Sequence, residues 1–304
     1  MLKKISICIP VFNEEENIIN IYKKINDIFE KDLRDYQHEF IFTDNNSDDR
    51  TQEIITDLCK KDKNVKYIRF KKNINYDNSI LQGYIHAKGD AAIVIDCDLQ
   101  DPPEMFEKFI NEWKNGYDLV YGKVKSRNES FIMSSLRQLY YKLINLNSYY
   151  DYPENAHDFR LIDKSIIEKL KNIDYIFPYV RGITFNFSKN PIGIVYDRNE
   201  RTKGKSKFGF YNSVTYSANA FYEETFLFTK ILRRLTLFIT TIFILFSTIN
   251  IFTNFAYLKF FDNLILSILI LLTIFLTVIT EYLTRIYLQL KKIKTNIYEF
   301  KINF

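Results

Sequence analysis

Short apolar runs alternate with helix-like segments through the N-terminal part of the chain, and this alternation restricts the fold more than any other feature. The runs are rich in Ile, Val and Phe, as is typical of buried strands, and they occupy residues 4–10, 39–43, 65–70 and 91–96. After the first run, apolar side chains recur at helical spacing at Ile18, Ile21, Ile25 and Ile28. This pattern predicts an α/β domain with a Rossmann-like, mostly parallel sheet and short right-handed crossovers.

Polar clusters follow three of the predicted strands, at residues 10–14, 44–47 and 96–100. The carboxyl ends of parallel strands meet at one edge of the sheet, and open α/β sheets bind their ligands there. We therefore expect the three clusters to converge in space and to form a binding site.

Asp96 and Asp98 are separated by one residue at the end of the most apolar strand. Side chains two residues apart on a strand point to the same face, so both carboxylates can reach one cation. Oxygen ligands favour Mg²⁺ or Mn²⁺, and a cation held by two carboxylates keeps positions open for phosphate oxygens. An Asp-x-Asp pair also occurs by chance and often caps a helix, so the pair alone does not decide between these roles.

Two uncharged apolar stretches, residues 235–258 and 263–280, are each long enough to cross a bilayer. Basic residues flank the pair on one side only, which by the positive-inside rule predicts that both termini lie in the cytoplasm. The alternative is a pair of buried core helices. The preceding residues 211–234 carry aromatic side chains on a helical pattern and predict an amphipathic helix at the membrane surface.

These features predict four parts of the chain. They are a cytoplasmic catalytic domain at 1–210, the juxtamembrane amphipathic helix at 211–234, a transmembrane hairpin at 235–284 and a cytoplasmic C-terminal tail at 285–304. The predicted location is the cytoplasmic membrane, with the protein crossing it twice.

Composition excludes several other classes of protein. The net charge is +5, and Lys and Arg are scattered rather than gathered into a basic stripe, so we expect no nucleic-acid partner. The three cysteines lie far apart without a CxxC pair, which predicts buried thiols in a reducing compartment rather than disulfides or a zinc site. The apolar stretch at the N-terminus is too short for a secretory signal.

Six segments, in this order, resemble the motifs of family 2 inverting glycosyltransferases with the GT-A fold. Among these, the chain resembles the polyprenyl-phosphate sugar synthases, which include the bactoprenol glucosyltransferases and the dolichyl-phosphate mannose synthases. The segments are IPVFNEEENI (9–18), FTDNNSDDRT (42–51), HAKGDAAIVIDCDLQDPPE (86–104), HDFRLIDK (157–164), RTKGKSK (201–207) and EYLTRIY (281–287). With the two apolar stretches, the resemblance covers essentially the whole chain, and it implies a homotetramer.

The resemblance implies roles on the donor side of the site. Pro10, Phe12, Glu14 and Asp44 would surround the base and ribose of a nucleotide-sugar. Asp96, Asp98 and Gln100 would hold Mg²⁺ or Mn²⁺ against the donor diphosphate.

It also implies roles on the acceptor side. Arg127 and Arg137 would bind the phosphate of the lipid, and Asp158 would lie near the acceptor, as a base or as a positioning group. Arg201, Ser206 and Lys207 would belong to a flexible loop that closes over the site. On this reading the catalytic residues are Asp96, Asp98, Asp158 and Arg127.

The chain departs from the family pattern at a few positions. Asn75 replaces a usual Gly, which Asn can do because it tolerates the left-handed backbone region. Asn45 and Asn46 replace a common Asp-Gly pair, so the sequence does not decide which nucleotide the donor carries. The three histidines, His38, His86 and His157, are not clustered in the sequence, and we expect them to be structural.

The favoured function is a metal-dependent transfer of a hexose, with glucose from UDP-glucose preferred, to polyprenyl (undecaprenyl) phosphate with inversion. A phosphate acceptor is already anionic near neutral pH and needs no strong base. One alternative is a transferase of the same fold that acts on a hydroxyl of a saccharide or glycan lipid, with Asp158 as its base. A second alternative is a non-catalytic membrane scaffold.

Overall fold

The computed structural model describes residues 2–125, 131–145, 153, 156–172, 178–199, 258–291 and 297–304, and the single positions 234, 238, 241, 242 and 245. The chain divides into two compact units. One unit comprises Met1–Ala220 with Thr295–Phe304, and the other is Phe221–Lys294.

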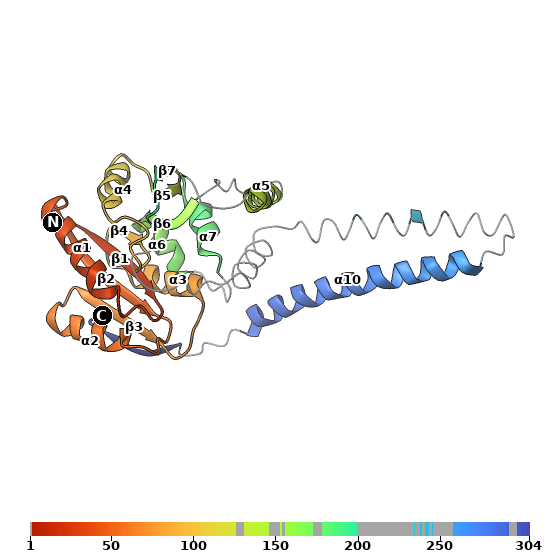
Figure 1. The fold of residues 1–304 in the computed structure, drawn as a ribbon, viewed down its shortest axis with the longest axis horizontal. Coiled ribbons are helices and arrows are strands. Elements are labelled where there is room, and N and C mark those ends of the chain that lie inside the picture. The colour runs from red at the N-terminus through yellow and green to blue at the C-terminus, as the bar shows by residue number, and fades with distance from the viewer. Residues whose placement is uncertain are drawn as a thin grey trace. The chain divides into compact units, whose positions relative to one another are not determined.

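The first unit is built on one mixed sheet (Figure 1). Its strand order is β7-β5-β6-β4-β1-β2-β3-β8. The strands are β1 (Lys3–Val11), β2 (Tyr36–Asp44), β3 (Val65–Phe70), β4 (Ala91–Val94), β5 (Leu119–Val124), β6 (Ala156–Asp163), β7 (Pro191–Tyr196) and β8 (Tyr298–Ile302). The central strands β3, β2, β1 and β4 are parallel, as is the β5–β7 pair, whereas β6 and β8 run antiparallel to their neighbours. The predicted α/β fold with a mostly parallel sheet is confirmed.

The register of the central strands places their carboxyl ends side by side. Val11, the last residue of β1, lies opposite Asp44, the last residue of β2. On the other side of β1, Cys8 lies opposite Val94 at the end of β4. The loops that follow these three strands therefore start from one edge of the sheet, as the sequence predicted.

Most helices of this unit bury apolar side chains. They are α1 (Ile18–Lys31), α2 (Thr51–Lys61), α3 (Tyr76–His86), α4 (Met105–Lys114), α5 (Phe131–Asn145), α6 (Lys164–Lys171) and α7 (Val180–Phe187). In α1, the buried residues include Ile18, Ile21, Ile25 and Ile28, which confirms the spacing read from the sequence. Helix α3 lies very close to β1, because a Cβ atom at Gly83 would be 2.9 Å from the Cβ of Cys8.

The C-terminal strand β8 joins the sheet beside β3, although α10 and the rest of the second unit lie between them in the chain (Figure 1). Asn303 fastens this strand, since its side chain donates hydrogen bonds to the carbonyl oxygens of Cys59 and Val65 at 2.9 and 2.8 Å. The sequence analysis assigned no strand to this segment.

Helix α10 (Leu258–Lys291) belongs to the second unit and contains the predicted apolar stretch 263–280. Several of its large apolar side chains are about half exposed, namely Ile265, Leu269, Leu272, Ile274, Leu276, Leu283 and Ile286. Among the described residues, no helix meets the length and hydropathy that crossing a membrane requires. Most of the predicted amphipathic helix 211–234 and most of the stretch 235–258 lie outside the described residues.

Candidate active site

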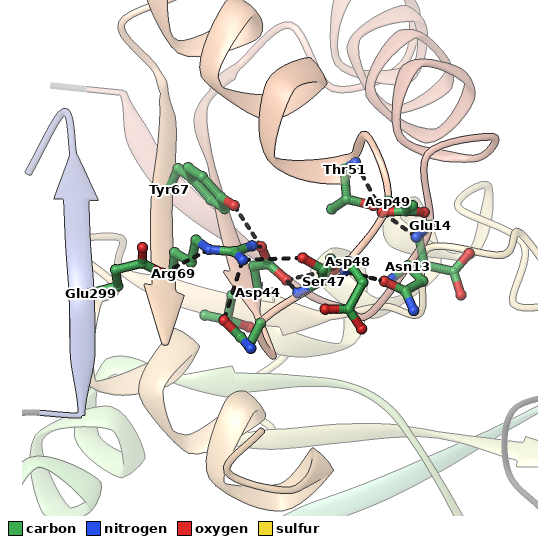
Figure 2. Close-up of polar contacts among 12 residues, drawn as sticks. Asn13, Glu14, Asp44, Ser47, Asp48, Asp49, Thr51, Tyr67, Arg69 and Glu299 are labelled. Carbon is green, nitrogen blue, oxygen red and sulfur yellow. Dashed lines mark hydrogen bonds and ion pairs between the residues drawn. The ribbon is translucent and has the colours of Figure 1, made fainter. Parts of the chain in front are cut away.

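Asp44 organises the loops that follow β1 and β2 (Figure 2). It is fully buried, and its Oδ1 accepts hydrogen bonds from the backbone N and the hydroxyl of Ser47 at 2.9 and 2.6 Å. Its Oδ2 accepts from the Tyr67 hydroxyl at 2.6 Å and from Nη1 of Arg69 at 2.7 Å. Four donors therefore occupy this carboxylate already, which favours an indirect role in which Asp44 fixes the loop that starts at Asn45.

Arg69 links this loop to the C-terminal strand. Its Nη2 donates to the side chain of Asn46 at 3.2 Å and to the carbonyl of Ser47 at 3.1 Å, and its Nε pairs with Glu299 of β8 at 2.8 Å (Figure 2). Sequence reasoning missed Arg69 and Glu299, because 230 residues separate them and no local pattern marks the contact.

The loop after β1 is tied to the same region. Asn13 has a left-handed backbone with φ 54° and receives the backbone N of Asp48 on its side-chain oxygen at 2.7 Å. The backbone N of Glu14 donates to the Thr51 hydroxyl at 2.9 Å, and the Glu14 carboxylate accepts from Asn17 at 2.6 Å. Among the predicted donor-side residues, Pro10 is buried within β1, while Phe12 and Glu14 are half-buried at its end.

The Asn residues that replace family positions adopt the conformations expected of them. Asn75 has φ 73° and Asn46 has φ 66°, so both take the left-handed region that Gly would otherwise supply. Asn45 is buried, and its side-chain oxygen accepts the backbone N of Ile74 at 3.3 Å. The loop before α3 is thereby held beside the end of β2.

A cluster of titratable groups lies just beyond β4. Asp96, Asp101 and His157 each present a potential metal-ligating atom, and these atoms lie within 4.8 Å of one another. The Tyr76 hydroxyl donates to Asp96 at 2.6 Å, and the Tyr196 hydroxyl donates to Asp101. The cluster is thus assembled from the ends of four elements, β4, α3, β6 and β7.

The carboxylates of this cluster favour a bound cation. Burial, followed by the charges of Asp101 and Asp98, raises the pKa of Asp96 to about 7. Burial lowers the pKa of His157 to about 4, so its imidazole is neutral near pH 7. Oδ2 of Asp101 is buried and accepts no hydrogen bond from the described residues. A divalent cation would relieve the repulsion between the carboxylates and would give this oxygen a partner.

The structure groups Asp96 with different partners from those predicted. Asp98 is buried beside Asp96, accepts the backbone N of Gln100 at 3.1 Å, and is not part of the three-residue group. Gln100 instead donates its side-chain amide to the carbonyl of Asn199 at 3.4 Å. The expectation that His157 is merely structural overlooked its position beside Asp101, at 3.4 Å. Direct metal contacts of Asp98 and Gln100 remain predictions.

The antiparallel pairing of β4 and β6 explains why His157 was missed. Val94 of β4 lies opposite Arg160 of β6, so the chain that leaves β4 runs beside the start of β6. The only available signal was Asp101 itself, a third acid within five residues of Asp96.

Asp158 is enclosed by two arginines. Its carboxylate receives Nε and Nη2 of Arg181 at 3.0 and 2.6 Å, and Nη2 of Arg160 lies 3.4 Å away. Burial alone would raise the pKa of Asp158, but the charge and hydrogen bonds of Arg181, with Arg160, hold it well below its usual range. Such a carboxylate is a weak base, so the geometry favours the positioning role that the sequence left open.

The remaining predicted acceptor residues are only partly described. Arg137 lies on α5 and is half-buried. Arg127, Arg201, Ser206 and Lys207 lie outside the described residues, and their roles remain predictions.

Comparisons with known proteins identify the family. The profile of glycosyl transferase family 2 matches residues 6–171, more than half of the chain. The chain belongs to glycosyl transferase family 2. It is 30% identical over 295 residues to the SfII prophage-derived bactoprenol glucosyl transferase of Shigella flexneri, a match that covers 95% of each chain.

One further relative and one solved structure are also similar to the chain. The glycosyltransferase YkcC of Bacillus subtilis (strain 168) is 33% identical over 204 residues, which are 67% of this chain and 62% of that protein. Glucosyl-3-phosphoglycerate synthase from Mycobacterium tuberculosis, solved with Mn²⁺ and UDP-glucose, matches with a TM-score of 0.47 and 16% identity, over 71% of this chain and 76% of that one. The family membership confirms that the chain is a glycosyltransferase with a GT-A-like α/β domain.

Proposed function

We propose that the protein transfers glucose from UDP-glucose to polyprenyl phosphate, with inversion at the anomeric carbon, and releases a lipid-linked monophosphoryl sugar. The observation that carries this proposal is the nearly full-length match to a bactoprenol glucosyl transferase, which includes the C-terminal apolar part of the chain. A relative of this length and name supports a polyprenyl phosphate acceptor and a glucosyl group.

The carboxylate cluster fits a divalent cation, Mg²⁺ or Mn²⁺. Asp96, Asp101 and His157 supply two carboxylates and a neutral imidazole, and one buried carboxylate oxygen accepts no hydrogen bond from the described residues. Such a mixed donor set suits Mn²⁺ at least as well as Mg²⁺. When bound, the cation would neutralise charge on the departing diphosphate.

The residues of this chain supply alignment rather than strong base chemistry. The network around Asp44 fixes the two loops that would line the nucleoside, and the Tyr76 hydroxyl orients the Asp96 carboxylate. An acceptor phosphate is already anionic near neutral pH, because its second pKa is about 6. It can therefore attack the anomeric carbon of the sugar without giving up a proton to the protein. This agrees with the absence of a poised base at Asp158, whose pKa is held low by arginines.

The alternative with a hydroxyl acceptor requires such a base. Arg181 forms two contacts with Asp158 and leaves it poorly suited to accept a proton. The lipid phosphate is therefore the acceptor that this site supports better.

We also propose that the protein acts at the cytoplasmic membrane with both termini in the cytoplasm. The half-exposed apolar side chains of α10 support contact of this helix with lipid. A homotetramer is implied by family resemblance and stays a prediction.

The test is to incubate membranes that contain the full-length protein with labelled UDP-glucose, undecaprenyl phosphate and Mn²⁺. We expect label in the organic extract, and its loss in the Asp96→Asn variant. If no common nucleotide-sugar gave extractable label, the proposal would be wrong. If label were transferred only from another nucleotide-sugar, the proposed acceptor would stand and the proposed donor would be wrong.

A further inference from the structure

Arg198 lies two residues beyond the end of β7 and directs its guanidinium at the carboxylate cluster. Its Nη2 is 3.5 Å from Oδ2 of Asp96, and its Nε is 3.3 Å from Oδ1 of Asp101. The side chain is 29% exposed, so this positive charge lies at the boundary between the cluster and solvent. Sequence reasoning assigned no role to Arg198.

The contacts of Arg198 are ion pairs rather than well-aligned hydrogen bonds. Its Nε is buried and has no hydrogen-bond partner among the described residues, although the Asp101 carboxylate is close. Arg181 differs, because two of its nitrogens donate hydrogen bonds to Asp158. The guanidinium of Arg198 is therefore held mainly by charge, and it can exchange its partner more readily than Arg181 can.

The backbone around Arg198 is fixed on both sides. The backbone N of Asn199 donates to the carbonyl of Gln100 at 2.8 Å, and the Gln100 side chain donates to the carbonyl of Asn199 at 3.4 Å. On the other side, the backbone N of Lys125 donates to the carbonyl of Tyr196 at 3.0 Å. A change of partner by Arg198 therefore needs movement of its side chain alone.

A divalent cation at Asp96 and Asp101 would lie close to this guanidinium and would be repelled by it. Repulsion between positive charges a few ångströms apart in a partly buried site is strong. A diphosphate that arrives with the cation brings negative oxygens, which can accept the guanidinium and remove the repulsion.

We propose that Arg198 is the resident counter-cation of the carboxylate cluster, and that it makes tight binding of the divalent cation depend on the diphosphate of the donor. Arg198 then has two partners in turn, the carboxylates before donor binding and the diphosphate after it. This inference rests on the proposed function for the class of donor, a nucleoside diphosphate sugar.

The test measures the dissociation constant of Mn²⁺ for the full-length protein by the electron paramagnetic resonance of free Mn²⁺, with and without UDP. The informative quantity is the ratio of the constant without UDP to the constant with UDP. In Arg198→Gln we expect Mn²⁺ alone to bind more tightly and the ratio to fall by about tenfold relative to the wild type. A fall smaller than about threefold, or a rise, would overturn the proposal.

Two further variants keep the result interpretable. Arg198→Met retains the aliphatic stem and should behave like Arg198→Gln, while the melting temperature reports whether each variant is folded. Arg34→Gln removes the same charge at an exposed position on the same domain and should keep the wild-type ratio. An equal fall in the Arg34→Gln variant would assign the effect to net charge and would overturn the proposal.

This experiment contains neither sugar nor lipid. Failure to form a glucolipid would therefore disprove the proposed function without altering the Mn²⁺ result. Lack of Mn²⁺ binding by the wild type, both with and without UDP, would overturn the role of Arg198 even if glucolipid were formed.

Discussion

Replacing Asp44 by Asn distinguishes a structural role of this carboxylate from direct contact with the donor. The wild-type side chain accepts four hydrogen bonds, two from Ser47 and one each from Tyr67 and Arg69. An Asn side chain has one acceptor oxygen and one donor amide, so the amide must face two of these donors. Among the residues that the structure describes, the substitution also leaves the buried Arg69 guanidinium with only the half-exposed Glu299 as a counter-charge.

The size of the effect follows from these losses. Removing one partner of a buried ion pair costs about 3–5 kcal/mol, and leaving a Ser47 or Tyr67 donor without an acceptor costs about 1–3 kcal/mol. For a domain of this size, that free energy lowers the melting temperature by about 10 °C. We expect a loss of this order in thermal and urea unfolding of the full-length protein, together with weaker UDP binding.

Asp48→Asn is the matched control, because the Asp48 side chain belongs to the same loop and is exposed. It should alter the free energy of unfolding by less than about 1 kcal/mol. The reasoning would be refuted if Asp44→Asn kept wild-type stability and lost only donor affinity, since that pattern belongs to a residue that contacts the nucleotide.

Three further outcomes follow from the buried charges and thiols. Burial alone would raise the pKa of Glu39, but hydrogen bonds from Lys4, Lys66, the backbone of Lys88 and Ser6 lower it to about 2 from 4.5. The Glu39 carboxylate therefore adds about 3 kcal/mol to the free energy of unfolding above pH 4.5, and this contribution is lost as the pH falls toward 2. In Glu39→Gln, the free energy of unfolding should change less with pH over this interval, as measured by urea unfolding. Burial lowers the pKa of Lys66, although Glu39 opposes this shift. The lowered pKa reduces the free energy of unfolding by a constant amount below neutral pH, so it does not change how stability depends on pH in acid. Asp158→Asn should reduce turnover while keeping the shape of the pH–rate profile above pH 5, whereas loss of an acid limb would identify Asp158 as a base. The three cysteines are buried, and burial raises the pKa of Cys8, so native protein should react with maleimide far more slowly than urea-unfolded protein; rapid labelling of all three without denaturant would contradict the packing.

The central sheet could be predicted from the sequence because its strands are rich in apolar residues and the apolar residues of α1 recur at helical spacing. The same reasoning placed the polar segments after β1, β2 and β4 at one edge, since parallel topology determines where strand ends meet. Asp96 was identified as a site residue for this reason.

The contacts that complete the site arise from pairings between distant segments. His157 reaches Asp101 because β6 runs antiparallel to β4, and Arg181 reaches Asp158 from α7, an element that the sequence analysis did not assign. Glu299 reaches Arg69 because β8 returns to the sheet after the second unit. No local periodicity carries this information, so charged side chains at these positions resemble ordinary surface residues until the topology is known.

The mass of the lipid product tests the central claim most directly. After reaction of the full-length protein with UDP-glucose and undecaprenyl phosphate, mass spectrometry should show the lipid phosphate heavier by one hexose residue, with the sugar released by mild acid as expected of a glycosyl phosphate. An unchanged lipid phosphate, with the hexose attached to a saccharide hydroxyl instead, would contradict the account.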